Sequence, residues 1–149
     1  MDTETLFRSL NEYDVRYVVI GAAAFPVHGY ARATLDVDVF IEPTEENARR
    51  TMAALRAFGY DVSDLTVEDL LQKKVLIRQY VVQTDLHPFV KGVRWEDVWA
   101  NRLESLLGGT PVSFASLDDL IRMKRAAGRP KDVEDLRVLE RIRSLGSEG

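Results

Sequence analysis

The chain has 149 residues with a formal net charge of −4, and 46% of its residues are hydrophobic and 30% charged. These values are typical of a globular protein with one hydrophobic core. The negative balance argues against a broad basic surface for DNA or anionic membranes. Cysteine is absent and only two histidines occur, which excludes disulfides, thiolate catalysis and cysteine-bound zinc and argues against a multi-histidine metal site.

The first 14 residues are acidic and contain no continuous apolar stretch of the kind found in a signal peptide. No later run approaches the roughly 20 apolar residues of a membrane span. We therefore expect a cytoplasmic protein with no membrane partner.

Hydrophobic periodicity predicts helices that alternate with strands along the chain. The predicted helices span residues 3–13, 22–28, 45–58, 67–73, 95–102, 117–127 and 131–144. The predicted strands span residues 15–20, the acidic stretch before Pro43, 75–86 (one long strand or two short ones with a kink) and 112–114 (a short edge strand). The pattern indicates an α/β (α+β) fold with a mixed β-sheet flanked by helices. We expect a single domain over residues 1–149, with a helical C-terminal part over about 116–144.

Helix boundaries carry their own signals. Thr44 is a predicted N-cap, and Thr66 with Asp69 matches a capping box. Ser116 and Asp119 match a second capping box.

Two acids stand out on the strand before Pro43. Asp36 and Asp38 are two positions apart, so their side chains point to the same face of a strand. The apolar residues of the opposite, buried face are Leu35, Val37, Val39 and Ile41. Adjacent carboxylates repel each other unless a positive charge lies between them, and a divalent cation with oxygen ligands is the usual partner. The alternative is a pair of ordinary solvated acids.

A third acid, Asp85, ends the later predicted strand. If the two strands are neighbours, three carboxylates converge at one edge of the sheet. Such a cluster can hold two Mg²⁺ ions for a phosphoryl-type displacement, with Asp85 placed to help deprotonate a hydroxyl. Gly21 follows the first strand, at a turn into a helix whose backbone N–H groups suit a phosphate oxygen.

This order of parts resembles the nucleotidyltransferase superfamily, which has the DNA polymerase β-like fold, and specifically its small minimal members. The resemblance rests on a strand ending in glycine, a short helix, the pattern R-x-T-x-D-x-D on the next strand and a later lone aspartate. The ending LDDLIRMKRAAGRPKDVEDLRVLE is similar to that of bacterial nucleotidyltransferase-like proteins related to the AbiEii toxin group.

The resemblance implies that Asp36, Asp38 and Asp85 are catalytic acids and ligands for two Mg²⁺ ions. It also implies that Gly21 is the phosphate-turn glycine. The implied reaction transfers a nucleoside monophosphate from an NTP such as ATP to a hydroxyl of a protein, an RNA or a small molecule. Ala22 departs from the Gly-Gly or Gly-Ser that the family usually has, which reduces the expected nucleotide affinity.

Basic residues gather near the last turn between helices, and triphosphates need cations. Lys124 and Lys131 are the candidates for facing a nucleotide, with a solvated helix face as the alternative. We expect Asp132 and Asp135 to balance their charge. In the loop before the acidic strand, Arg32 and Thr34 either bind the nucleotide or shape the loop, and Arg32 is well placed to meet a phosphate.

Other residues allow two interpretations. We expect His28 to bond to backbone at a helix end, whereas His87 shares a face with Asp85 and is as readily functional as structural. The spacing of Trp95 and Trp99 predicts core packing.

Three functional alternatives follow. The first is a nucleotidyltransferase, possible as a toxin–antitoxin component with an antitoxin partner or as a homodimer. The second is a catalytically weak or inactive nucleotide- or partner-binding module on the same fold. The third is a metal-dependent phosphohydrolase that uses the same acids.

Overall fold

A computed structural model describes residues 2–34 and 36–148, so the predicted position of Leu35 lies outside the described residues. The α-helices are α1 (Thr3–Glu12), α2 (Glu45–Phe58), α3 (Val67–Gln72), α4 (Trp95–Asn101), α5 (Leu117–Ala127) and α6 (Val133–Glu148). Three 3₁₀ helices are η1 (Gly21–Ala24), η2 (Pro26–His28) and η3 (Pro130–Asp132). The strands are β1 (Tyr17–Ile20), β2 (Asp36–Ile41), β3 (Val75–Ile77), β4 (Gln83–His87), β5 (Leu103–Leu107) and β6 (Thr110–Phe114).

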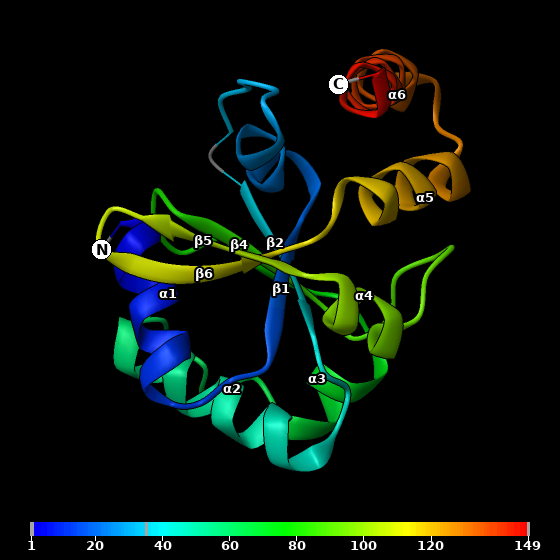
Figure 1. The fold of residues 1–149 in the computed structure, drawn as a ribbon. Coiled ribbons are helices and arrows are strands. Elements are labelled where there is room, and N and C mark those ends of the chain that lie inside the picture. The colour runs from blue at the N-terminus through cyan, green and yellow to red at the C-terminus, as the bar shows by residue number, and fades with distance from the viewer. Residues whose placement is uncertain (1, 35, 149) are drawn as a thin grey trace.

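The strands form one six-stranded mixed sheet in the order β3-β4-β2-β1-β6-β5. Strand β2 lies between β1, which runs antiparallel to it, and β4, which runs parallel. Helices flank this sheet (Figure 1), so the predicted fold class is confirmed. Among the described residues, no helix combines the length and the apolar character that crossing a bilayer needs.

The two faces of the sheet carry different elements. Val37, Val39 and Ile41 are buried on the face that α1 and α2 cover, where Phe7 of α1 stacks on Tyr17 with ring centroids 5.8 Å apart. The intervening residues of β2 face the other way. There the two acids lie at one end of the strand, and α5 and α6 lie on this side of the sheet (Figure 1).

Three predicted elements differ from the structure. Residues 22–28 form two 3₁₀ turns rather than one helix, because Pro26 has no N–H with which to continue a helical ladder. Residues 75–86 contain two strands, as one alternative proposed, but these form an antiparallel hairpin instead of a kinked strand. The predicted strand at residues 112–114 is part of β6, but its predicted place at the edge of the sheet is wrong, because β6 pairs with both β1 and β5.

Strand β5 was missed because its burial pattern is weak: Leu103 and Leu106 remain exposed. Both N-caps Thr44 and Thr66 are confirmed, and Thr66 makes the full capping box. Ser116 also caps its helix, but the carboxylate of Asp119 accepts hydrogen bonds from Asn101 and Arg122 instead of completing a box.

One buried side chain joins the two central strands to α2. Asn47 accepts a hydrogen bond from the backbone N–H of Arg16 at 2.8 Å. It also donates to the carbonyl oxygens of Arg16 and Glu42, each at 3.0 Å. All three partners lie where β1 begins and β2 ends, so Asn47 holds β1 and β2 against the helix, and β2 is the strand that carries Asp36 and Asp38.

Replacing Asn47 with alanine is expected to lower the free energy of unfolding by about 2–3 kcal/mol, because three backbone groups lose their partner in a buried place. Urea unfolding, with the slope of the transition compared between proteins, measures this. Arg49→Ala on the same helix is the control, since it removes only an exposed ion pair and should cost less than about 1 kcal/mol. Equal effects of the two substitutions would contradict the assignment.

Candidate active site

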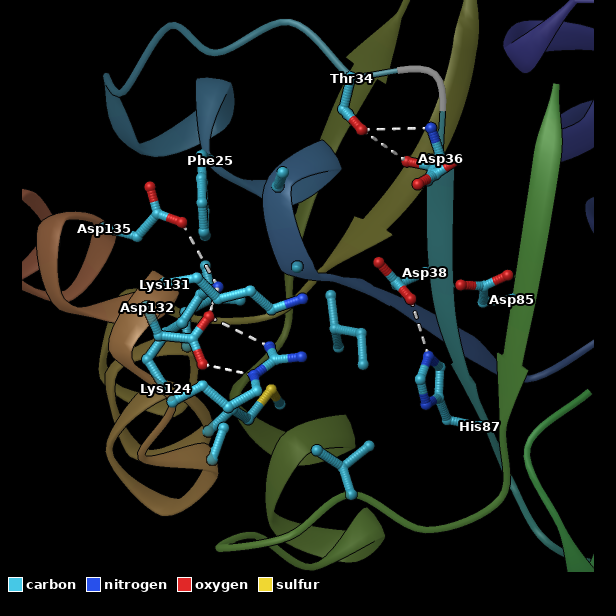
Figure 2. Close-up of a pocket in the computed structure, with 18 of the residues that line it drawn as sticks. Phe25, Thr34, Asp36, Asp38, Asp85, His87, Lys124, Lys131, Asp132 and Asp135 are labelled. Carbon is cyan, nitrogen blue, oxygen red and sulfur yellow. Dashed lines mark hydrogen bonds and ion pairs between the residues drawn. The ribbon is translucent and has the colours of Figure 1, made fainter. Parts of the chain in front are cut away.

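The parallel pairing of β2 and β4 brings the acids together. Asp38 lies directly opposite Asp85 in the register of the two strands, so both side chains point to the same face. Asp36 is two positions earlier on β2 and shares this face. The prediction that the strand of Asp85 neighbours the strand of the paired acids is therefore confirmed (Figure 2).

Each acid has a different set of contacts. The carboxylate of Asp85 accepts a hydrogen bond from the guanidinium of Arg78, which raises the pKa of Arg78 further. Asp38 Oδ1 lies 2.8 Å from His87 Nε2. Asp36 is exposed, and its backbone N–H donates to Thr34 Oγ1 at 3.1 Å. Thr34 therefore shapes the start of β2 while it lines the same pocket.

The turn at Gly21 packs directly on one of these acids. Gly21 has φ of +67°, a left-handed conformation that favours glycine. A Cβ atom at this position would lie 2.8 Å from Asp38 Oδ2. The turn opens η1, and no side chain caps it. Glycine at position 21 thus permits both the backbone conformation and the close approach of the carboxylate.

A pocket of about 430 Å³ extends from the acids to the C-terminal helices. All nine residues predicted from the sequence to form the site line it: Gly21, Ala22, Arg32, Thr34, Asp36, Asp38, Asp85, Lys124 and Lys131. Figure 2 shows the acids and His87 on one side and the residues of α5, η3 and α6 on the other. Tertiary structure thus brings into one cavity residues that are up to 110 positions apart in the sequence.

The side facing the acids is basic but contains two buried carboxylates. Lys124 Nζ lies 3.1 Å from Asp132 Oδ1 and 3.5 Å from Asp135 Oδ2. Arg129 donates to Asp132 through Nε at 2.6 Å. Asp132 and Asp135 balance the local charge as predicted. Among the described residues, Lys131 is exposed and has no carboxylate partner, so its charge faces the pocket uncompensated.

Aromatic residues that the sequence did not indicate support this side. Phe25 is fully buried and stacks on Tyr30, with ring centroids 5.2 Å apart. The charged groups of Arg32 and Lys124 lie 5.9 and 5.5 Å from the centre of the Phe25 ring. Asp135 accepts a hydrogen bond from the Tyr30 hydroxyl at 2.9 Å and pairs with Arg32.

These contacts change the acidities of the buried groups. Burial raises the pKa of Asp132, but hydrogen bonds from Arg129 and Lys124 outweigh it and hold that pKa below its ordinary value of 3.8. Burial likewise raises the pKa of Asp135, but the hydrogen bonds that Tyr30 and Arg32 donate to it have the larger effect, so the pKa of Asp135 is lowered. Both carboxylates are therefore charged at neutral pH.

The sequence did not indicate that a charged residue, Arg78, contacts the acids, but the expected structural roles of His28 and the two tryptophans are confirmed. Arg78 lies in the connection between β3 and β4, and no local pattern marks it as a partner of Asp85. His28 bonds to the carbonyl oxygen of Ala115 at 2.8 Å, as expected for a structural histidine. Trp95 and Trp99 stack with centroids 5.4 Å apart, and Trp95 is buried, which confirms core packing.

The donor chemistry of the acidic side fits Mg²⁺, because three carboxylates offer the hard oxygen ligands that this ion prefers. Within residues 2–34 and 36–148, no three His, Cys, Asp or Glu side chains converge closely enough to hold an ion. Asp85 instead contacts Arg78 and Asp38 contacts His87.

Residues 2–145 match the family described as "Nucleotidyltransferase of unknown function (DUF6036)". The chain belongs to this family. The fold is also similar to a crystal structure from Thermotoga maritima of a protein provisionally assigned as a nucleotidyltransferase. That match has a TM-score of 0.62 and 15% sequence identity, and it covers 89% of this chain and 86% of the other. No protein with a curated description matches the sequence significantly.

The glycine turn gives a direct test of the acidic side. Gly21→Ala should lower the free energy of unfolding by about 1–2 kcal/mol through left-handed strain and displace the Asp38 carboxylate from His87. Gly29→Ala is the matched control, because Gly29 also has positive φ but has open space around its missing Cβ. NMR should show shifted His87 ring signals in the first variant only. Unshifted His87 signals in Gly21→Ala would contradict the packing described.

The basic side has a pH-dependent consequence. Because the folded pKa of Asp132 lies below the unfolded value of about 3.8, this contribution to stability is complete above that pH. It is lost as the pH falls through the folded pKa. Asp132→Asn should therefore lower the free energy of unfolding by about 1–3 kcal/mol at pH 7, and the difference from the unsubstituted protein should shrink below about pH 4.

Urea unfolding at pH 7, 5 and 3 measures this difference. Glu134→Gln is the control, since this exposed residue lies two positions later, in α6, and pairs with the exposed Arg137. A difference between Asp132→Asn and the unsubstituted protein that stays constant down to pH 3 would contradict the assignment.

Proposed function

We propose that this chain transfers a nucleoside monophosphate from an NTP, such as ATP, to a hydroxyl group of an acceptor and releases pyrophosphate. The observation that carries the proposal is the pocket itself. It holds three carboxylates on one side, cationic side chains on the other and the Gly21 turn between β1 and η1. This arrangement suits a substrate that is a polyanion and reacts with the help of divalent cations.

The basic side of the pocket would bind the triphosphate. Lys131, Arg32 and Lys124 offer it positive charge. The buried acids Asp132 and Asp135 do not cancel the charge on this side, because their ion-pair partners are three cations, Lys124, Arg32 and Arg129. The turn at Gly21 offers backbone N–H groups to a phosphate oxygen. Binding on this side orients the α-phosphate toward the acids. Most of the proposed rate enhancement therefore comes from positioning and charge compensation.

In the proposed reaction the acceptor oxygen forms a bond to the α-phosphorus, and the bond from that phosphorus to the bridging oxygen of the β-phosphate breaks. Asp85 would take the proton of the attacking hydroxyl. Asp36, Asp38 and Asp85 would hold two Mg²⁺ ions. When bound, these ions would neutralise charge on the attacking and leaving oxygens.

The acceptor class and the biological setting belong to the same proposal. A protein side chain, an RNA end or a small molecule each provides a suitable hydroxyl, and we propose a cytoplasmic setting. The similarity of the C-terminal segment to proteins related to the AbiEii group supports a role as a toxin–antitoxin component, with an antitoxin or a second copy as partner. Growth arrest on expression, relieved by Asp38→Ala, would support this role.

A second candidate is a nucleotide- or partner-binding module with little or no catalysis. Two observations favour it. Ala22 follows Gly21 and supplies no hydroxyl for a phosphate, and Asp38 and Asp85 are already engaged by His87 and Arg78.

The test is incubation of the protein with each α-³²P-labelled NTP, Mg²⁺ and a lysate of the host cells. We expect label on a protein, RNA or small-molecule band, and its loss in the double variant Asp36→Ala/Asp38→Ala. Asp64→Ala is the matched control, because this aspartate is exposed and lies outside the pocket. Label should persist in that control.

The other outcomes discriminate between the alternatives. Consumption of the NTP with no label on any acceptor would favour a phosphohydrolase that uses the same acids. Nucleotide binding without consumption would favour the binding module and overturn the transferase.

A further inference from the structure

A permanent positive charge lies against one of the acids that line the pocket. Arg78 follows the last residue of β3, and its guanidinium donates to Asp85 Oδ1. The hydrogen bond that Arg78 donates to Asp85 raises the pKa of Arg78 most, burial opposes this rise, and the negative charges of Asp36 and Asp38 add to it. Arg78 therefore compensates the same three carboxylates that would bind Mg²⁺.

The two ends of this ion pair differ in their surroundings. The Asp85 side chain is only 9% exposed, whereas that of Arg78 is 41% exposed. Repulsion between two cations on the same buried carboxylate is poorly screened. A guanidinium does not lose its proton in a protein, so it reduces its repulsion of an incoming cation only by moving away. Its exposure gives it a path into solvent.

We propose that Arg78 competes with a divalent cation for Asp85, so that binding of the metal requires the Arg78 side chain to leave the acidic side. This inference rests on the proposed function, because it assumes that the metal binds at Asp36, Asp38 and Asp85. Arg78 then sets the metal affinity of the protein and keeps the acids compensated in the metal-free protein.

The surrounding contacts restrict this movement to the side chain. The next residue, Gln79, exchanges two hydrogen bonds with the backbone of Asp61, at 2.6 and 2.7 Å. The hydroxyl of Tyr80 donates to the carbonyl oxygen of Gly59 at 2.8 Å. These bonds tie the β3–β4 connection to the segment after α2, so Arg78 exchanges partners while the backbone stays in place.

The experiment measures Mn²⁺ binding to the full chain without nucleotide, by the EPR signal of free Mn²⁺ and by calorimetry. Arg78→Gln should tighten binding by about fivefold, the size of effect that removal of a single, partly exposed competing ion pair can give. Arg78→Lys keeps a cation beside Asp85 and should stay within about twofold of the unsubstituted protein. Asp85→Asn should weaken binding strongly in either background.

Lys74→Gln is the matched control. Lys74 also lines the pocket and is exposed, but among the described residues it pairs with no carboxylate. Its substitution removes one positive charge nearby without freeing an acid, so the Mn²⁺ affinity should change less than twofold. A tightening equal to that of Arg78→Gln would show a general charge effect and overturn the specific competition.

A second measurement does not depend on substitution. The NMR signal of the Arg78 Nε–H group should move when Mg²⁺ is added, whereas the backbone signals of Gln79 and Tyr80 should stay nearly unchanged. Unchanged or weaker Mn²⁺ binding by Arg78→Gln would overturn the competition, and weaker binding would instead show that Arg78 positions Asp85 for the metal. If neither the unsubstituted protein nor Arg78→Gln binds Mn²⁺, the metal-dependent part of the proposed function fails together with this inference.

Discussion

Like charges on one face of a sheet are the constraint on which this structure depends. The register of β2 against β4 places Asp38 opposite Asp85, and Asp36 shares their face. Such a group of carboxylates is costly unless positive charge or hydrogen bonds compensate it. Arg78 and His87 do so from neighbouring positions, and Gly21 admits the Asp38 carboxylate against its backbone. The cost of this arrangement is consistent with a functional role for the acids.

On the opposite side of the pocket, positive charges gather and carboxylates compensate them. Lys124, Arg32 and Arg129 converge from separate elements and would repel one another, and the buried carboxylates of Asp132 and Asp135 hold them together. The Arg32–Asp135 ion pair also attaches α6 to the loop that precedes β2. The ionic network therefore both shapes the pocket and leaves it a positive side, to which exposed Lys131 adds.

Family membership and fold agree on the architecture of the protein, and the contacts of individual side chains describe the chemistry of its pocket. The family and the similar Thermotoga maritima structure point to nucleotidyltransferase architecture. The contacts of individual residues supply the chemistry: an acidic side, a basic side and a glycine turn around one cavity. The contact between Arg78 and Asp85 compensates the charge of one of these acids, a detail that the architecture alone does not contain.

The sequence by itself determined the features that depend on near neighbours along the chain. Alternation placed Asp36 and Asp38 on one face, and the caps at Thr44 and Thr66 set two helix starts, because these effects act within a few residues. Only the tertiary structure decided that β6 lies inside the sheet and that Arg78 meets Asp85. Strand order and ion pairing depend on which distant segments pack together, and local patterns carry little information about that packing.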